Sequence, residues 1–179
     1  TYIARAPGHF NLESRWHDTL ARFMGDLRTA FASELPIVLL DFRATERMVS
    51  GGTLLFCCEL NRLIEMFPAK SVRCIPSKNN VVNQVLEHLG IYKLCSYESG
   101  VTPSRKDVVT WQVASSDVVD GEKVGTLIEA SLTGDLAKQA FRGATEAMIN
   151  CVNHAYEAPR NDGLPRSAIK KWWMFCRQN

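Results

Sequence analysis

The sequence predicts a mixed α/β fold in which helices and strands alternate along the chain. Two observations predict it. Apolar residues recur every third or fourth position over residues 12–33, and the continuous apolar run Ile37–Leu40 follows. A second helical pattern over residues 53–67 precedes another short apolar strand, Ser71–Ile75. A β-α-β order implies parallel strands joined by crossover helices, so we expect these two strands to be parallel neighbours with the helices packed against them.

The elements of the first part follow from local patterns. The helix over residues 12–33 has one apolar stripe, made of Leu12, Trp16, Leu20, Phe23, Leu27 and Phe31. The uninterrupted run Ile37–Leu40 is typical of a strand that is buried on both faces of a sheet. Residues 79–89 predict a further helix, which ends at Gly90 because glycine favours the left-handed conformation of a helix C-cap.

A polar segment separates the two parts of the chain. Residues 99–106 contain glycine and proline without any periodicity, which predicts a domain boundary. We therefore expect one domain over residues 1–105 and a second over 106–179. In the second, Val108–Ala114 predicts a strand and Asp120-Gly121 a hairpin turn.

The rest of the second part reads as one long helix between shorter elements. Gly125–Ser131 is expected to be a second strand or an irregular stretch, and residues 134–157 a helix. Pro159–Pro165 then predicts a loop, and Ile169–Cys176 a final strand.

Composition excludes several classes of protein. The 179 residues carry a net charge of +2 and no cluster of Lys or Arg, which argues against binding to nucleic acid. The longest apolar runs, such as Thr53–Cys58, are too short to span a membrane. The six cysteines show no C-x-x-C spacing and no zinc tetrad, so we expect reduced thiols in a cytoplasmic protein. Because the first residue is Thr1 rather than Met, we expect a piece of a longer protein.

One helix carries the most informative pattern. At about 100° per residue, Glu146, Asn150, Asn153 and His154 fall on one narrow stripe. Magnesium takes oxygen ligands and keeps several waters, so an Asn carbonyl oxygen beside phosphates could complete its shell. A carboxylate one turn away could act as a general base. The alternative is that these side chains only form hydrogen bonds with neighbouring loops. We expect the stripe to face an open groove rather than the core.

The segment resembles the N-box of the GHKL ATPase superfamily, which includes gyrase and the histidine kinases. The resemblance rests on Glu146, Asn150, His154 and Ala155 in the order E-x-x-x-N-x-x-x-H-A, within Glu146–Tyr156. It is closest to the variant found in anti-sigma-factor kinases and histidine kinases. The resemblance implies that Asn150 binds magnesium, that Glu146 is the catalytic base, and that Asn153 and His154 contact the nucleotide phosphates.

The sequence departs from that family in one respect. The D-x-G-x-G motif that lies under the adenine does not occur, and Asp120-Gly121 lies on the wrong side of the N-box. The resemblance therefore implies ATP and magnesium as cofactors of a complete domain, and weak or absent ATP binding by these 179 residues. An ATPase or protein kinase activity would need residues beyond Asn179.

The first part resembles a STAS domain, the fold of anti-anti-sigma factors. The resemblance rests on Leu39–Phe42, Arg47–Gly52, Val72–Pro76 and Val81–Ile91. Where that family has a D-S-S-G turn, this chain has Val49-Ser50-Gly51-Gly52, which places glycine at the usual phosphoacceptor position. An ordinary turn that opens a helix, with Ser50 as its N-cap, is the alternative. The predicted architecture is a STAS-like layer followed by a partial GHKL α/β sandwich.

These features predict a cytoplasmic regulator of the partner-switching, anti-sigma type. It would couple ATP and magnesium binding to a protein partner, a regulator or sigma-like factor, without nucleic acid or membrane, and a homodimer is compatible with the sequence. One alternative is a non-catalytic interaction module derived from the same two domains. Another is an unrelated small-molecule enzyme whose site lies at strand ends near Asp41 and Ser50.

Overall fold

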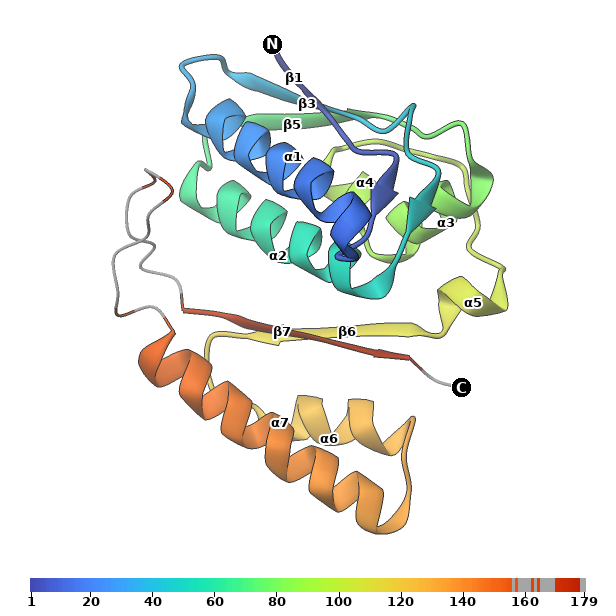
Figure 1. The fold of residues 1–179 in the computed structure, drawn as a ribbon, viewed down its shortest axis with the longest axis vertical. Helices are drawn as coiled ribbons and strands as arrows, with labels where there is room; N and C mark the ends of the chain where they lie inside the picture. The colour runs from blue at the N-terminus through green and yellow to red at the C-terminus, as the bar shows by residue number, and fades with distance from the viewer. Residues whose placement is uncertain (156, 158–161, 163, 165–169, 178–179) are drawn as a thin grey trace. The chain divides into compact units, whose positions relative to one another are not determined.

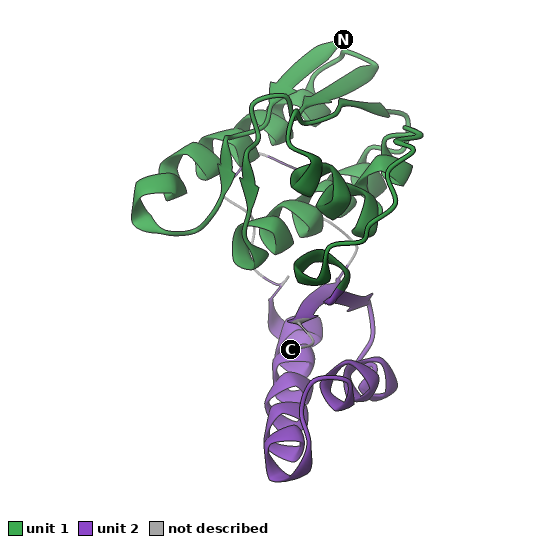
Figure 2. Cartoon of the chain, turned by 90° about the vertical axis from the view of Figure 1, so that its right-hand side faces the viewer, with its two compact units in different colours: residues 1–109 green, residues 110–179 purple. Residues whose placement is uncertain are grey.

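The chain folds into two compact units, each with its own strands and helices (Figure 2). The computed structural model describes residues 1–155, 157, 162, 164 and 170–177. The predicted α/β class is confirmed. Unit 1 spans Thr1–Val109 and unit 2 spans Thr110–Asn179, so the division falls shortly after the boundary that we expected at residue 105.

Unit 1 contains five short strands and five helices among its described residues. In chain order they are β1 (Tyr2–Arg5), β2 (His9–Phe10), α1 (Ser14–Ala32), β3 (Ile37–Asp41), β4 (Arg47–Met48), α2 (Ser50–Met66), β5 (Ser71–Ile75), α3 (Asn80–His88), α4 (Ile91–Leu94) and α5 (Lys106–Val109).

The main sheet of unit 1 has the strand order β1-β3-β5, and both pairings are parallel. Ile37 pairs with Ser71 and Asp41 with Ile75, which confirms the predicted parallel neighbours. The strands β2 and β4 form a second, two-stranded parallel pair. We did not predict β1, β2, β4, α4 or α5, because segments of two to four residues contain too few positions to show a periodicity.

The sheet is buried on one face and partly open on the other, which corrects the expectation of burial on both faces. Val38 and Leu40 are fully buried, whereas Ile37 and Leu39, which point to the opposite face, are half-buried. On β1, Ile3 is 46% exposed while its neighbour Ala4 is buried. The helices α1 and α2 lie together on one side of the three strands (Figure 1).

Aromatic side chains form the centre of the unit 1 core. Phe10, Phe42 and Phe56 are fully buried, and their ring centroids lie 5.1 to 6.4 Å apart. Phe23 of α1 completes the cluster, 5.8 Å from both Phe10 and Phe56. The part of the predicted stripe from Leu20 to Phe31 is therefore buried against α2 and the strands, whereas Leu12 precedes α1 and is 47% exposed.

The helix boundaries of unit 1 follow from local chemistry. The Asn79 side chain accepts a hydrogen bond from the backbone N–H of Val81 and so caps α3. Gly90 follows that helix with φ +71°, which confirms the predicted left-handed position. By contrast α2 begins at Ser50, three residues before the expected start, so the Gly51-Gly52 pair belongs to the first turn of the helix.

Unit 2 has two strands and two helices among its described residues. They are β6 (Trp111–Ser116), α6 (Gly121–Glu129), α7 (Gly134–His154) and β7 (Trp172–Arg177). The strands β6 and β7 are antiparallel, with Trp111 opposite Arg177 and Ser116 opposite Trp172. The expected strand Val108–Ala114 is shifted toward the C-terminus, because Val108 belongs to the short helix α5.

The expected hairpin at Asp120-Gly121 is wrong, and so is the expected strand or irregular stretch Gly125–Ser131. Asp120 is the N-cap of α6, and its Oδ1 accepts a hydrogen bond from the backbone N–H of Lys123 at 3.0 Å. Val124, Leu127 and Ile128 are buried at helical spacing. An Asp-Gly pair can form a hairpin turn or cap a helix. Here the burial of Val124, Leu127 and Ile128 on one helix face favours the helix.

A small core joins the elements of unit 2. It consists of Val124, Ile128, Met148 and Trp172, against which half-buried side chains of β6, α7 and β7 pack. The indole N–H of Trp172 donates a hydrogen bond to the carbonyl oxygen of Val118 at 2.7 Å. The helix predicted over residues 134–157 ends at His154, and the predicted loop Pro159–Pro165 lies largely outside the described residues.

Candidate functional site

The four predicted site residues all lie in the second half of α7. Glu146, Asn150, Asn153 and His154 have exposed side chains. They occupy successive turns of one continuous helix, so they share one face as the spacing predicted. The face is exposed to solvent rather than packed in the core, but none of the four residues lines a cavity described in the structure, so the predicted groove beside them is not seen among the described residues.

The opposite face of α7 explains why the polar stripe points outward. Met148 is 3% exposed and packs in the core of unit 2, together with Ala144, Cys151 and Val152. The Sγ of Cys151 donates a hydrogen bond to the carbonyl oxygen of Lys171, the residue before β7, at 3.4 Å. These contacts determine the rotation of the helix about its axis, so the stripe that carries Glu146 and Asn150 is directed away from the sheet.

The charged side chains at the two ends of α7 match the direction of the helix dipole. Asp135 lies in the first turn and His154 in the last, where an acidic and a basic side chain respectively favour the helix. The Nδ1 of His154 lies 3.8 Å from Oε1 of Glu157, which follows the helix. The side chain expected to contact phosphate therefore has a carboxylate neighbour, which competes with an anionic ligand for the imidazole.

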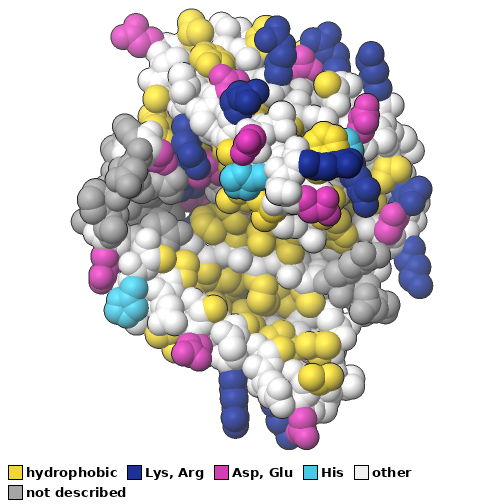
Figure 3. Space-filling view, viewed as in Figure 1, with side chains coloured by type: hydrophobic (Ala, Val, Ile, Leu, Met, Phe, Trp, Pro, Cys, Tyr) yellow, Lys and Arg dark blue, Asp and Glu magenta, His cyan; other side chains and the backbone are white. Residues whose placement is uncertain are grey.

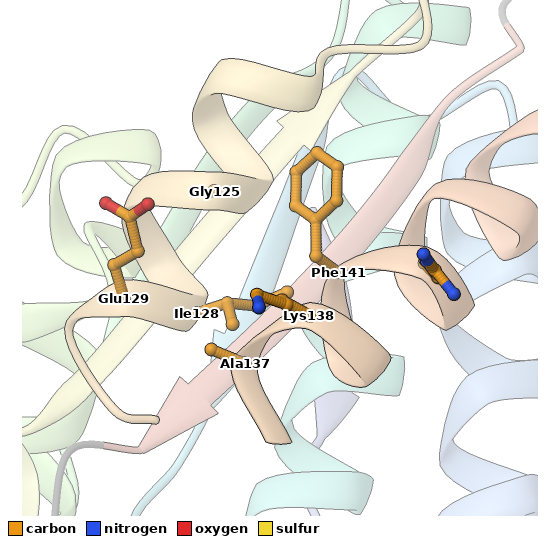
Figure 4. Close-up of a pocket in the computed structure, with 7 residues that line it drawn as sticks. Gly125, Ile128, Glu129, Ala137, Lys138 and Phe141 are labelled. Atoms are coloured by element: carbon orange, nitrogen blue, oxygen red, sulfur yellow. The ribbon is translucent and has the colours of Figure 1, made fainter. Parts of the chain in front are cut away.

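A cavity of about 340 Å³ lies between α6 and the first half of α7 (Figure 4), and none of the four predicted site residues lines it. The apolar part of its wall comes from Ile128, Ala137 and Phe141. A Cβ on Gly125 would lie 3.7 Å from the Phe141 ring, an ordinary van der Waals distance, so the ring packs close to the α6 backbone. The charged part comes from Glu129, Lys138 and Arg142. Of these, Lys138 contacts Asp135, with Nζ 3.5 Å from Oδ1.

Sequence reasoning missed Arg142 as a neighbour of the stripe. It lies four residues before Glu146, one helical turn earlier on the same face, and its side chain is exposed. The signal was available, because extending the helical spacing backwards from Glu146 reaches Arg142. A cation at this position can attract phosphate, and it can equally be an ordinary solvated charge on the helix surface.

The donor set fits a hard cation only in part. The Glu146 carboxylate and the Asn150 amide supply two oxygen donors, the ligand type that magnesium prefers. Within the described residues, no group of three or more His, Cys, Asp or Glu side chains is placed to hold a metal. Asn150 could therefore serve as a magnesium ligand only if phosphate and water supplied the rest of the coordination shell, with Glu146 one helical turn away.

The turn before α2 is the second candidate. Ser50 is the first residue of the helix, and its side chain is exposed. Val49 rather than Ser50 is the N-cap, and no side-chain hydrogen bond caps the helix there, so the expected capping role of Ser50 is wrong. An exposed hydroxyl at a helix N-terminus is in a favourable place for a negatively charged group.

Asp41, the other residue of the small-molecule alternative, is engaged in an ion pair. Its Oδ2 lies 2.7 Å from Nη2 of Arg43, and its Oδ1 accepts hydrogen bonds from Nε and the backbone N–H of the same residue. These hydrogen bonds lower the pKa of Asp41 although burial opposes them. The carboxylate is thus held charged and paired, which makes it a poor general base.

The distribution of charged side chains on the surface indicates which long-range electrostatic interactions the protein can make. On the face drawn in Figure 3, Lys and Arg side chains are interspersed with Asp and Glu rather than gathered into one field. Among the described residues, none of the helices combines the length and apolar character needed to cross a membrane.

Comparison of the sequence with protein-family models and with curated proteins, and of the fold with solved structures, finds no match.

Proposed function

We propose that this chain is part of a cytoplasmic regulator of the partner-switching type, in which ATP and magnesium binding by unit 2 is coupled to protein binding by unit 1. The observation that carries the proposal is the exposed oxygen-donor pair Glu146 and Asn150 on α7, one turn apart. Packing of the opposite helix face in the core of unit 2 presents this pair to solvent.

In this proposal Asn150 would hold magnesium through its amide oxygen, and Glu146 would orient a water or act as a base. Asn153 and His154 would lie near the phosphates. Arg142, one turn before Glu146, adds the positive charge that the predicted stripe lacked. The bound ATP and magnesium would supply the phosphoryl chemistry, while these side chains would bind and position the nucleotide.

Unit 1 supports the partner-binding half of the proposal. Its parallel sheet has one partly open face, on which the side chain of Ile3 is 46% exposed. The glycine-containing turn ahead of α2 places Ser50 on the surface. An exposed helix entry and an incompletely covered sheet are surfaces that a protein partner can use, and the interspersed charges do not favour a polyanion.

A specific observation favours a second candidate, the non-catalytic interaction module. The described cavity lies between α6 and α7, and neither Glu146 nor Asn150 lines it. A bound nucleotide usually occupies a concave site with several converging groups. In the module, the stripe of α7 would be a solvated helix face, and binding to a protein partner would need no nucleotide.

A titration followed by NMR separates these two candidates. The isotope-labelled 179-residue chain is titrated to millimolar concentration with a non-hydrolysable ATP analogue, with and without magnesium. The proposal expects magnesium-dependent shifts of the amides around Glu146, Asn150 and Asn153, because the ligand would lie against that face. Asn150→Ala should remove most of the magnesium-dependent part.

Gln139→Ala is the matched control, because Gln139 is an exposed amide on the same helix two turns before Glu146. It should leave the shifts unchanged. Shifts that are absent with magnesium, or equally large in Asn150→Ala, would reject the nucleotide half of the proposal and leave the interaction module.

A further inference from the structure

The cavity between α6 and the first half of α7 is apolar on both of its helices. Ile128 of α6 is 6% exposed, Ala137 of α7 is half-buried, and the ring of Phe141 is 37% exposed. Figure 4 shows the Phe141 ring beside the turn of α6 that carries Gly125. The cavity volume of about 340 Å³ is near the lower end of the usual range for ligand sites, about 300–1,000 Å³. A ligand that fills this cavity is therefore small and has an apolar body.

Two cationic side chains line the same cavity, and both belong to α7. Lys138 and Arg142 are four residues apart, so they are neighbours on one face of the helix. Like charges at this spacing repel each other and weaken a helix. An anion held between the two side chains would remove this repulsion, and the planar guanidinium of arginine can bind both oxygens of a carboxylate.

The partners of these two cations within the protein are weak. The Nζ of Lys138 lies 3.5 Å from Oδ1 of Asp135, and both side chains are largely exposed. Water screens such a surface pair, so it holds Lys138 only weakly. Within the described part of the chain, Arg142 forms no ion pair, and its side chain is exposed. The positive charge on the α7 wall is therefore available to a ligand.

The wall formed by α6 has the opposite charge. Glu129, the last residue of α6, lines the cavity from that side, whereas Lys138 lines it from α7 (Figure 4). The Glu129 carboxylate repels any negatively charged group on its own side of the cavity. A ligand with one negative charge, directed toward α7, therefore suits the cavity better than a polyanion does.

We propose that this cavity is a binding site for a small monocarboxylic acid with an aromatic or branched apolar body. The ligand carboxylate accepts hydrogen bonds from the Arg142 guanidinium and the Lys138 ammonium group. Its apolar body packs against Ile128 and Phe141, and covering the exposed Phe141 ring removes apolar surface from water.

The test uses phenylacetate as the probe and the isotope-labelled 179-residue chain, with the amide shifts followed by NMR. We expect saturable shifts at millimolar phenylacetate, centred on Gly125, Ile128 and Phe141. Phenylacetamide has the same ring without the charge, and acetate has the charge without the ring. Each should bind at least about tenfold more weakly than phenylacetate, because each lacks one of the two interactions.

Four variants locate the probe in the cavity. Arg142→Gln should weaken phenylacetate binding about tenfold, because the ligand loses a charge-assisted hydrogen bond. Lys123→Gln is the matched control, since it also removes one positive charge from unit 2 but does not line the cavity, and the affinity should stay within about twofold. Glu129→Gln should strengthen binding about two- to threefold by removing the repulsion. Ala137→Leu should abolish binding, because the larger side chain fills the cavity.

Four results would overturn the proposal, with the folding of each variant checked by its circular dichroism spectrum. They are shifts that stay linear up to the highest phenylacetate concentration, equal affinity for phenylacetate and phenylacetamide, an equal loss in Arg142→Gln and Lys123→Gln, and unchanged binding in Ala137→Leu. Tighter binding of N-acetylphenylalanine than of phenylacetate would also overturn it, by assigning the cavity to the carboxyl end of a peptide.

The carboxylate site and the proposed nucleotide site can fail separately. Neither Glu146 nor Asn150 lines the cavity. Asn150→Ala should therefore bind phenylacetate as tightly as the unsubstituted chain does, whether or not it changes the response to nucleotide.

Discussion

A Cβ atom on Gly52 would lie 2.5 Å from the backbone carbonyl carbon of Phe10, because the first turn of α2 packs directly on the strand β2. Gly52 is buried, and its φ is not in the left-handed region, so the need for glycine is one of space rather than of conformation. This close approach brings the turn that contains Ser50 onto the central aromatic cluster.

Gly52→Ala should therefore destabilise the protein. The methyl group meets backbone rather than a flexible side chain, and relief requires a shift of α2 or β2, at a cost of about 1–3 kcal/mol in the free energy of unfolding. Denaturant unfolding followed by circular dichroism measures it. Gly25→Ala in the middle of α1 is the matched control, since nothing lies within 4 Å of the added Cβ. It should be neutral or stabilise by about 0.5–1 kcal/mol, and an equal loss in both variants would contradict the steric argument.

The buried ion cluster between α1 and α2 gives a second prediction. The carboxylate of Glu59 is bound by Arg62, with Oε1 2.7 Å from Nη2 and Oε2 3.0 Å from Nε, and by Nε of Arg28. Glu59 and Arg62 are almost fully buried. Glu59→Gln leaves the Arg62 charge uncompensated and should cost roughly 3–5 kcal/mol of unfolding free energy. Glu34→Gln, at an exposed position, should change it by less than about 0.5 kcal/mol, as denaturant titration can show.

Stability should also depend on pH through Glu59. Burial alone raises the pKa of Glu59, but the hydrogen bonds and charges of Arg62 and Arg28 outweigh it, so that the pKa lies below its usual range. The unfolded state then binds the proton at higher pH than the folded state. The stabilisation that the Glu59 carboxylate contributes is fully present above about pH 4.3, the ordinary pKa of Glu. It is lost as the pH falls through the pKa of Glu59 in the folded state. Unfolding free energies measured between pH 6 and 3 should fall less steeply in Glu59→Gln; an unchanged slope would show that other carboxylates dominate.

The N-cap of α6 gives a prediction for unit 2. Asp120 accepts the backbone hydrogen bond of Lys123 and lies 3.1 Å from its Nζ, and these contacts lower the pKa of Asp120. Asp120→Ala should expose the first N–H groups of α6 and raise amide exchange at Lys123 severalfold, as hydrogen exchange followed by NMR can measure. Asp120→Asn keeps an acceptor oxygen, so the Lys123 amide should exchange nearly as slowly as in the unsubstituted chain. Equal exchange in all three chains would show that the cap is dispensable.

The affinity for nucleotide is the last prediction. Without a D-x-G-x-G motif, the 179-residue chain has only the α7 side of the proposed site. Calorimetry should therefore find no ATP binding tighter than roughly millimolar, a free energy near −4 kcal/mol, with or without magnesium. Micromolar binding that Asn150→Ala leaves unchanged would place the nucleotide elsewhere in the molecule and reduce the N-box resemblance to coincidence.

Much of unit 1 could be predicted because its signals are local and repeated. The stripe from Trp16 to Phe31, the run Ile37–Leu40 and the strand Ser71–Ile75 each indicate one element, and their order requires parallel pairing. The burial of each face could not be predicted. An apolar run shows that a strand is hydrophobic on both sides, but it does not show that a helix covers each side.

The candidate site shows the same limit. The spacing of Glu146, Asn150, Asn153 and His154 predicted a shared helix face, since a helix has one fixed period. It could not show that α6 and the first half of α7 enclose a cavity, because the sequence had suggested a hairpin where α6 lies. Asp120-Gly121 is compatible with either structure, and the choice depends on contacts with Met148 and Trp172, which are distant in the chain.

By itself, then, the sequence determined the α/β class, the order of most helices and strands, and the common face of the α7 stripe, because these depend on periodicities within short segments. Only the tertiary structure decided that α6 is a helix and that one face of the sheet stays partly open. Each of these depends on which surfaces pack together across long separations in the chain, and local spacing shows that a segment has an apolar face without showing which other surface covers it.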